Sequence, residues 1–229
     1  MPRTHGKQAL VVLSGGQDSA TCLFLAKRDY DRVHTIFFDY GQRHAIEKVY
    51  AHKLSTRFAH THTVVEVPLH RVTESALIHR TIPVSERGGF DDLPTTFTPG
   101  RNLVFLTYAA IFAVSHDIKD IFTGVSQTDY SGYPDCRQPF IDSFMKTFSH
   151  AMGEKTKKPT VEIHTPLMRL SKAQTFKLAQ DIGALKFIIN DTMTCYHGDE
   201  ALNYWGRGCT KCPACKLRAK GFEEFMSWA

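Results

Sequence analysis

Residues 14–19 carry the groups that a polyphosphate needs, because they read Ser-Gly-Gly-Gln-Asp-Ser between an apolar run and a helical pattern. Glycines without Cβ atoms let backbone N–H groups approach an anion closely, and the positive end of the following helix favours the same anion. The lysine of the G-x-x-x-x-G-K-[ST] loop is absent, so the turn predicts a different kind of nucleotide site. Asp18 is a candidate Mg²⁺ ligand and, as an alternative, the N-cap of the helix.

Four cysteines near the end of the chain follow the spacing C-x13-C-x2-C-x2-C, which predicts a metal site at Cys195, Cys209, Cys212 and Cys215. Four thiolates are a ligand set for tetrahedral, structural zinc. An iron–sulfur cluster also takes four cysteines and is the alternative occupant. Basic residues that could offset the negative charge of such a site lie close by in the sequence, at Arg207, Lys211, Lys216 and Arg218.

The residues that must position these groups alternate between strand and helix patterns. Short apolar runs predict strands at residues 9–13, 33–38, 63–67, 120–125 and 161–164. Helices are predicted from about residue 18, at 45–58, 102–115 and 139–152, and from a capping box at 171–174 to a stop at Gly183. This alternation predicts a parallel, doubly wound, Rossmann-like α/β sheet with ligands beyond the carboxyl ends of its strands.

The stretch 77–100 lacks periodicity and is rich in glycine and proline, which predicts a long loop that serves as a lid or a substrate wall. A Pro-Gly turn ends this loop and opens a helix. We therefore expect Arg101 to reach a phosphate and Asn102 to cap the helix.

Size and charge narrow the class of protein. The 229 residues fit one α/β domain, predicted as 1–190, with a small zinc-binding segment, predicted as 191–229. The net charge of +5 suits small anionic substrates but is too low for a dedicated nucleic-acid binder, so no stable nucleic-acid partner is expected. No apolar run is long enough for a membrane span and the first residues do not form a secretion signal, which predicts a cytoplasmic location with reduced cysteines.

The turn at 14–19 resembles the SGGxDS loop of the N-type ATP pyrophosphatases, which cleave ATP between the α- and β-phosphates. Further motifs carry a resemblance over nearly the full length: Asp-Tyr-Gly-Gln-Arg-His at 39–44, Pro-Gly-Arg-Asn at 99–102, Thr-Gly-Val at 123–125, Ser-Gly-Tyr-Pro-Asp-Cys-Arg at 131–137, and the four cysteines. In this order they resemble the 7-cyano-7-deazaguanine synthase family. The resemblance implies a fold of the adenine nucleotide alpha hydrolase (HUP/PP-loop) type. The stretch from Tyr196 to Gly208 is longer than the family pattern and is expected to bulge as a surface loop.

The resemblance also implies roles for individual residues. The nucleotide is expected to contact Leu13, Ser14, Gly15, Gly16, Gln17, Asp18, Ser19, Ala20, Thr21, Cys22, Leu23, Phe38 and Asp39. The residues expected to act on the reacting phosphates are Ser14, Asp18, Ser19 and Arg101. Asp129 or Asp135 is expected to accept the N1–H and 2-amino hydrogens of the substrate base, and Arg137 to pair with its carboxylate. Cys136 could attack the activated carbonyl, although the sequence shows no partner base.

The family reaction converts 7-carboxy-7-deazaguanine to its nitrile with ATP, Mg²⁺ and ammonia. We expect adenylation of the acid, capture by free ammonia as the amide, and a second adenylation on the way to the nitrile, with AMP as the nucleotide product. Two rival functions are another ATP pyrophosphatase reaction, such as tRNA thiolation, and a non-catalytic nucleotide sensor. The sequence leaves the oligomeric state open, with a homodimer among the alternatives.

Overall fold

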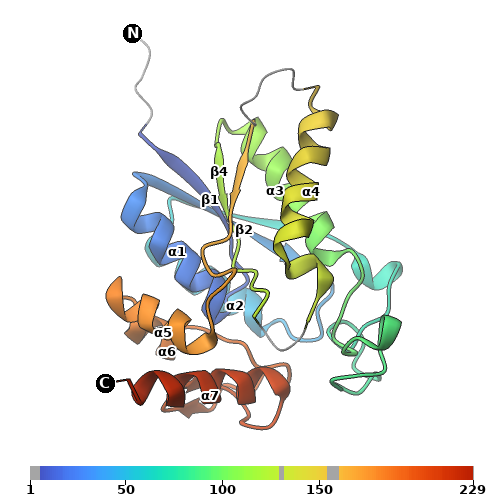
Figure 1. Ribbon diagram of the computed structural model, residues 1–229, viewed down its shortest axis with the longest axis vertical. Helices are drawn as coiled ribbons and strands as arrows, with labels where there is room; N and C mark the ends of the chain where they lie inside the picture. Colours follow the sequence, from blue (N-terminus) through green and yellow to red (C-terminus); the bar gives the residue numbers. More distant parts are fainter. Residues whose placement is uncertain (1–5, 129–131, 154–159, 229) are drawn as a thin grey trace.

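The computed structural model describes residues 6–128, 132–153 and 160–228. Strands and helices alternate along most of the chain (Figure 1). The strands are β1 (Gln8–Val12), β2 (Arg32–Asp39), β3 (Thr61–Glu66), β4 (Asp120–Phe122), β5 (Glu162–His164), β6 (Leu202–Asn203) and β7 (Gly206–Arg207). The α-helices are α1 (Gln17–Asp29), α2 (Ile46–Phe58), α3 (Arg101–Ser115), α4 (Gln138–Ala151), α5 (Lys172–Asp181), α6 (Leu185–Asn190) and α7 (Pro213–Met226). Short 3-10 helices lie at η1 (Leu69–Arg71), η2 (Phe90–Asp92) and η3 (Pro134–Cys136).

Within the described residues, β1 to β5 form one sheet in the order β3-β2-β1-β4-β5, and all neighbours are parallel. The strand order reverses at β1: the chain moves outward through β2 and β3, then returns to the other side of β1 for β4 and β5. This topology confirms the predicted doubly wound parallel α/β fold. It places a crevice beyond the carboxyl end of β1, where the Ser-Gly-Gly turn begins.

Helices cover both faces of the sheet, with α1 on one side and α3 and α4 on the other (Figure 1). The side chains of β1 alternate between two cores: Ala9 and Val11 pack with α1 and α2, whereas Leu10 packs with α3 and α4. Burial on both faces explains why β1 reads as a continuous apolar run. None of the helices in the described part of the chain combines the length and apolar character needed to cross a bilayer.

The predicted elements are confirmed in type, and most of their bounds differ by one or two residues. The capping box is confirmed, because Ser171 Oγ accepts a hydrogen bond from the Gln174 N–H at 3.2 Å. Gly183 has a φ of +71° just after α5, as a helix stop requires. The strand predicted to end at residue 125 is wrong in length, since β4 ends at Phe122.

The predicted cap of α3 is also wrong. The N-cap is Gly100, in the left-handed conformation, and Asn102 lies inside the first turn. The Asn102 backbone N–H instead donates to Asp135 Oδ2 at 3.2 Å. The carboxylate of Asp135 thus satisfies an N–H group that the helix start leaves open.

The C-terminal part is more ordered than the sequence indicated, with α6, a β6–β7 hairpin and α7 after α5. α7 runs beside α5 (Figure 1), and Phe176 of α5 contacts the rings of Phe222 and Phe225. The surface bulge expected after Tyr196 is wrong in part, because Trp205 is only 3% exposed although Tyr204 is 63% exposed. The domain division after residue 190 stays a prediction.

Candidate functional site

The turn between β1 and α1 is held by its own serines. Ser19 Oγ accepts from the Ser14 N–H at 3.1 Å, donates to the Gly16 carbonyl at 3.1 Å, and lies 3.0 Å from Ser14 Oγ. α1 begins at Gln17, and no side chain in the described residues caps it. The N–H groups of its first turn therefore remain available for an anion.

Glycine is required in this turn because other backbone segments approach it closely. Gly15 has a φ of +84°, and a Cβ there would lie 2.6 Å from the Glu47 carbonyl oxygen and 2.8 Å from the Ala51 nitrogen of α2. Gly124, in the loop after β4, is equally confined, since its Cβ would lie 2.8 Å from the Ser19 nitrogen. The turn is thus fixed between α2 and the loop that follows β4.

Asp18 pairs with a lysine from a distant part of the chain. Its Oδ2 accepts from Lys172 Nζ at 2.6 Å, and the Lys172 side chain is only 12% exposed. The alternative that Asp18 is the N-cap is wrong, because the helix starts one residue earlier at Gln17. Its Oδ1 is buried with no hydrogen-bond partner among the described residues, which leaves lone pairs for a cation.

Replacing Lys172 with methionine is expected to lower the free energy of unfolding by about 2–4 kcal/mol, because the Asp18 carboxylate would lose its cation in a largely buried place. Urea denaturation measures the change. Lys177→Met is the matched control, since Lys177 pairs with Asp181 at the surface and should cost about 0.5 kcal/mol or less. Equal losses in the two variants would contradict the expectation.

A cavity of about 550 Å³ lies over the turn and the ends of the neighbouring strands. One part of its wall is formed by the turn, Lys172, Thr194 and residues 123–126. Phe38 and Phe105, whose stacked rings have centroids 4.4 Å apart, line it as well. Leu77 and other residues of the long loop 77–100 complete the wall, which agrees with the predicted role of that loop.

Arg101 faces this cavity beside several tyrosines. Its guanidinium lies 5.9 Å from the centre of the Tyr40 ring. Burial opposes its charge, but the electrostatic influence of Tyr40 and Cys136 outweighs that and raises the pKa of Arg101. The residue therefore offers a permanent positive charge inside the pocket, as a group that binds phosphate or carboxylate must.

The structure brings together most of the residues predicted to contact the nucleotide. The cavity lining includes Leu13, Ser14, Gly16, Gln17, Asp18, Ser19, Phe38 and Arg101. Four others lie in α1 with no exposed surface and pack into the core: Ala20, Thr21, Cys22 and Leu23. These four residues are absent from the cavity lining, and Cys22 is an interior thiol. Gly15 and Asp39 are not among the lining residues, and Asp39 pairs with Lys48 Nζ at 3.0 Å.

The predicted substrate residues are placed less favourably. Asp135 is buried against the start of α3, where its carboxylate accepts from the Asn102 N–H, and it does not line the cavity. Arg137 is exposed and donates to the Gly132 carbonyl at 3.1 Å. Asp129 lies outside the described residues. Cys136 does reach the cavity lining, 3.2 Å from Asn102 Nδ2.

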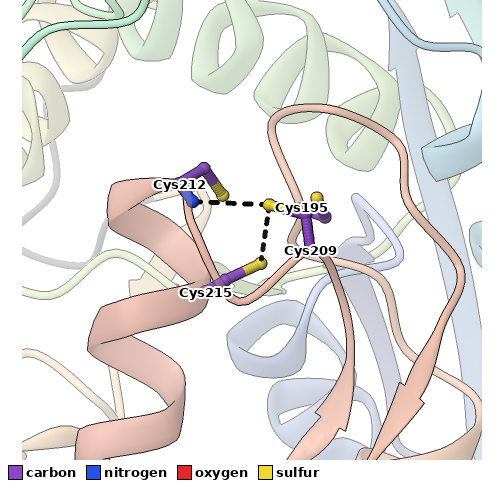
Figure 2. Close-up of side chains that lie close together, drawn as sticks. All are labelled: Cys195, Cys209, Cys212 and Cys215. Carbon is purple, nitrogen blue, oxygen red and sulfur yellow. Dashed lines mark hydrogen bonds between the residues drawn. The ribbon is translucent and has the colours of Figure 1, made fainter.

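The four cysteines converge from two loops and the start of α7 (Figure 2). All four sulfurs lie within 4.8 Å of one another, and those of Cys209 and Cys215 are 3.9 Å apart. A tetrahedral ion with metal–sulfur distances of about 2.3 Å would place its ligands about 3.8 Å apart, so the cluster could hold a single metal ion. Hydrogen bonds from Cys212 and Cys215 lower the pKa of the Cys195 thiol, which favours a thiolate there.

The cysteine cluster is joined to the turn by the short segment 193–195. The Met193 N–H donates to the Gly15 carbonyl at 2.9 Å, and Thr194 contacts Gly16. Arg218 of α7, which is 1% exposed, donates to Thr194 Oγ1 at 3.2 Å and to the Ile188 carbonyl at 2.6 Å. Burial lowers its pKa to about 10. The segment 193–195 and Arg218 therefore link the cysteine cluster to the turn at residues 14–19.

A family model described as "Queuosine biosynthesis protein QueC" matches residues 8–226. The chain belongs to the QueC family. Its curated relatives match nearly the whole QueC chain: a 7-cyano-7-deazaguanine synthase of Bacillus subtilis (strain 168) is 45% identical, with 96% of this chain and 95% of that protein covered. One from Clostridium acetobutylicum is 44% identical, with 96% and 95% covered. Among solved structures, a 4-thiouridine synthetase–RNA complex with bound ATP gives a TM-score of 0.49 at 15% identity, over 95% of this chain and 53% of that one.

Sequence reasoning missed several residues of the site. Glu47, Lys172 and Tyr196 line the cavity, as do Lys216 and Lys220 of α7. Lys172 stands next to the capping serine, and the sequence indicated only a helix start there. The basic residues near the cysteines were interpreted as counter-charges for the metal, yet Lys216 and Lys220 face the cavity.

Proposed function

We propose that this protein is a 7-cyano-7-deazaguanine synthase, which converts 7-carboxy-7-deazaguanine and ammonia to the nitrile at the expense of ATP. Membership of the QueC family and relatives that bear this enzyme name support the assignment. The structural observation that carries it is one cavity lined both by the turn at residues 14–19, the proposed phosphate turn, and by Arg101. A volume of about 550 Å³ lies within the usual range for small-molecule sites.

ATP would lie with its β- and γ-phosphates on the turn and its adenosine toward Phe38. The open N–H groups of α1 and the hydroxyl of Ser14 would hold the pyrophosphate leaving group. Lys172 and Asp18 stand beside that position, and Asp18 would be a ligand of the Mg²⁺ that accompanies the nucleotide. Arg101 would stabilise charge at the α-phosphate.

The chemistry requires activation because a carboxylate has no adequate leaving group. One carboxylate oxygen attacks the α-phosphorus, pyrophosphate leaves, and the acyl adenylate reacts with ammonia to give the amide and AMP. Loss of the second oxygen from the amide requires another adenylation before the nitrile forms. The protein contributes positioning and electrostatic stabilisation to these steps. For the base, Asp129 and Arg137 stay predicted contacts, whereas Asp135 is better placed to orient the start of α3.

We propose structural zinc for the cysteine cluster in the segment 191–229. Sulfurs within 4.8 Å of one another favour one ion over an iron–sulfur cluster, because a cluster of several metal atoms has to fit between its cysteines. Each of the six cysteines is a free thiol, which suits a reducing compartment such as the cytoplasm. Free ammonia is proposed as the nitrogen donor.

Incubation of the protein with ATP, Mg²⁺, ammonium and 7-carboxy-7-deazaguanine tests the function, with mass analysis of the base and nucleotide products. The expected products are the nitrile, AMP and pyrophosphate, with AMP formed in excess over nitrile because the amide is adenylated as well. Equal amounts of AMP and nitrile would rule out a second adenylation. ADP as the nucleotide product would contradict the pyrophosphatase chemistry, and no turnover at all would favour a nucleotide sensor.

A further inference from the structure

Glu47 is an acidic residue of the cavity to which the sequence assigned no role. It lies in the first turn of α2, and its backbone carbonyl is the atom that a Cβ at Gly15 would strike. Glu47 also lines the cavity, beside the turn at residues 14–19. The groups that influence it electrostatically there are Arg101 of α3, Tyr40 after β2, and Tyr196 near the cysteines.

The carboxyl of Glu47 is free to act, in contrast to the other carboxyl near the phosphates. Asp18 is held by Lys172 at 2.6 Å. Glu47 has no hydrogen bond or ion pair through its side chain in the part of the chain that the structure describes. Glu47 is partly buried, and a carboxyl with reduced access to water and no partner costs free energy, which is typical of a group kept for a ligand or a reaction.

We propose that Glu47 is the general base that accepts a proton from ammonia as it adds to the adenylated acid. This role rests on the proposed synthase function. Glu47 lines the same cavity as the turn, where pyrophosphate would depart, and as Arg101, which would face the activated carboxyl group.

The step balances as follows. The nitrogen of ammonia forms a bond to the carboxyl carbon of the acyl adenylate, and the bond from that carbon to the adenylate oxygen breaks. AMP leaves with the electron pair, and the Glu47 carboxylate takes one N–H proton, which leaves the neutral amide. The protonated Glu47 returns its proton to water before the next addition. No other reactant is needed.

The environment suits this task. Burial raises the pKa of Glu47 to about 7, while the positive charge of Arg101 opposes the rise. A base with a pKa near the working pH is half ionised there and still holds a transferred proton well. Because the ionised form is the active one, the rate of the ammonia step should rise as the pH increases through about 7 and then level off.

The rest of the cavity offers few alternatives. Among its described lining residues there is no histidine, and the carboxylates are Asp18, Glu47 and Glu86. Asp18 is paired with Lys172, and Glu86 is exposed on the long loop. Glu47 is thus the enclosed carboxyl that is not already neutralised by a lysine.

The test is Glu47→Gln, with two partial reactions measured on the full-length protein. ATP–pyrophosphate exchange with the acid, in the absence of ammonium, reports adenylation and should stay within about threefold of wild type, since removal of a base need not disturb ATP binding. Amide and nitrile formation should fall by about a hundredfold or more and lose the rise near pH 7. The concentration of unprotonated ammonia is held constant across the pH series. Glu47→Asp should keep the rise at a reduced rate, because it keeps a carboxylate.

Glu74→Gln, an exposed residue outside the cavity lining, is the matched control and should behave as wild type. The role of Glu47 is overturned if Glu47→Gln keeps the pH-dependent ammonia step, loses exchange and the ammonia step equally, or changes only the KM for the acid. Those results leave the synthase function standing when the wild type makes nitrile. A wild-type protein that makes none overturns the function and this role together.

Discussion

Cys215→Ser is expected to abolish metal binding and to lower the free energy of unfolding by several kcal/mol. Cys215 has no exposed surface and its sulfur lies 3.9 Å from that of Cys209, so serine would replace a ligand with a group that does not retain zinc. Metal binding in small zinc sites is worth about 10–16 kcal/mol, as large as the net stability of a whole domain. Metal content by elemental analysis and the midpoint of urea denaturation measure both effects.

Loss of ATP cleavage should accompany the loss of metal. The segment 193–195 connects the cluster to the Gly15 carbonyl, so its disorder would displace the phosphate turn. Cys22→Ala is the control: Cys22 is also completely buried but belongs to the core of α1, so this variant should keep one metal per chain and lose about 1–2 kcal/mol. Full metal content in Cys215→Ser would rule out this ligand set.

Gly15→Ala is expected to reduce ATP cleavage by about a hundredfold or more, since a shift of about 1 Å in a site can have that effect. The added Cβ would meet the Glu47 carbonyl oxygen at 2.6 Å, and the turn or α2 would have to move. Strain at positive φ and the collision together should lower the free energy of unfolding by about 3 kcal/mol. Initial rates of pyrophosphate release and urea denaturation provide the two measurements.

Gly183→Ala separates the effect of backbone strain at positive φ from the effect of the collision with α2. Gly183 also has a positive φ, of +71°, but a Cβ there would meet no atom within 4 Å. This variant should lose about 1 kcal/mol from backbone strain alone and retain normal ATP cleavage. If Gly15→Ala and Gly183→Ala lose the same free energy of unfolding and both keep ATP cleavage, the close approach of α2 to the turn is not needed for activity.

The parts of the fold that were predictable from the sequence are those that depend on local patterns. β1 is buried on both faces and reads as an apolar run, and the turn that follows it has its glycines and serines within six residues, 14–19. The cysteine cluster was predictable for the same reason, since Cys209, Cys212 and Cys215 are close in sequence. β4 was overestimated because Val125 continues the apolar run after the chain has left the sheet.

What the sequence could not indicate depends on contacts between distant residues. Asp18 and Lys172 are 154 positions apart, so no local pattern links them. Glu47 reads as an ordinary helix residue until the fold turns it toward Arg101. Asp135 stands in a turn-rich motif, and only the approach of α3 shows that its carboxylate is used by the Asn102 N–H.

The hydrogen bond from Met193 to the Gly15 carbonyl has a consequence for synthesis of the chain on the ribosome. The nucleotide turn is translated among the first residues, whereas its support comes from residues near the end. A nascent chain, or a product of premature termination before residue 193, would contain every residue of the turn but would lack the hydrogen bond from Met193 to Gly15. Such fragments should not consume ATP, so wasteful hydrolysis is avoided until the end that carries the four cysteines has emerged and folded.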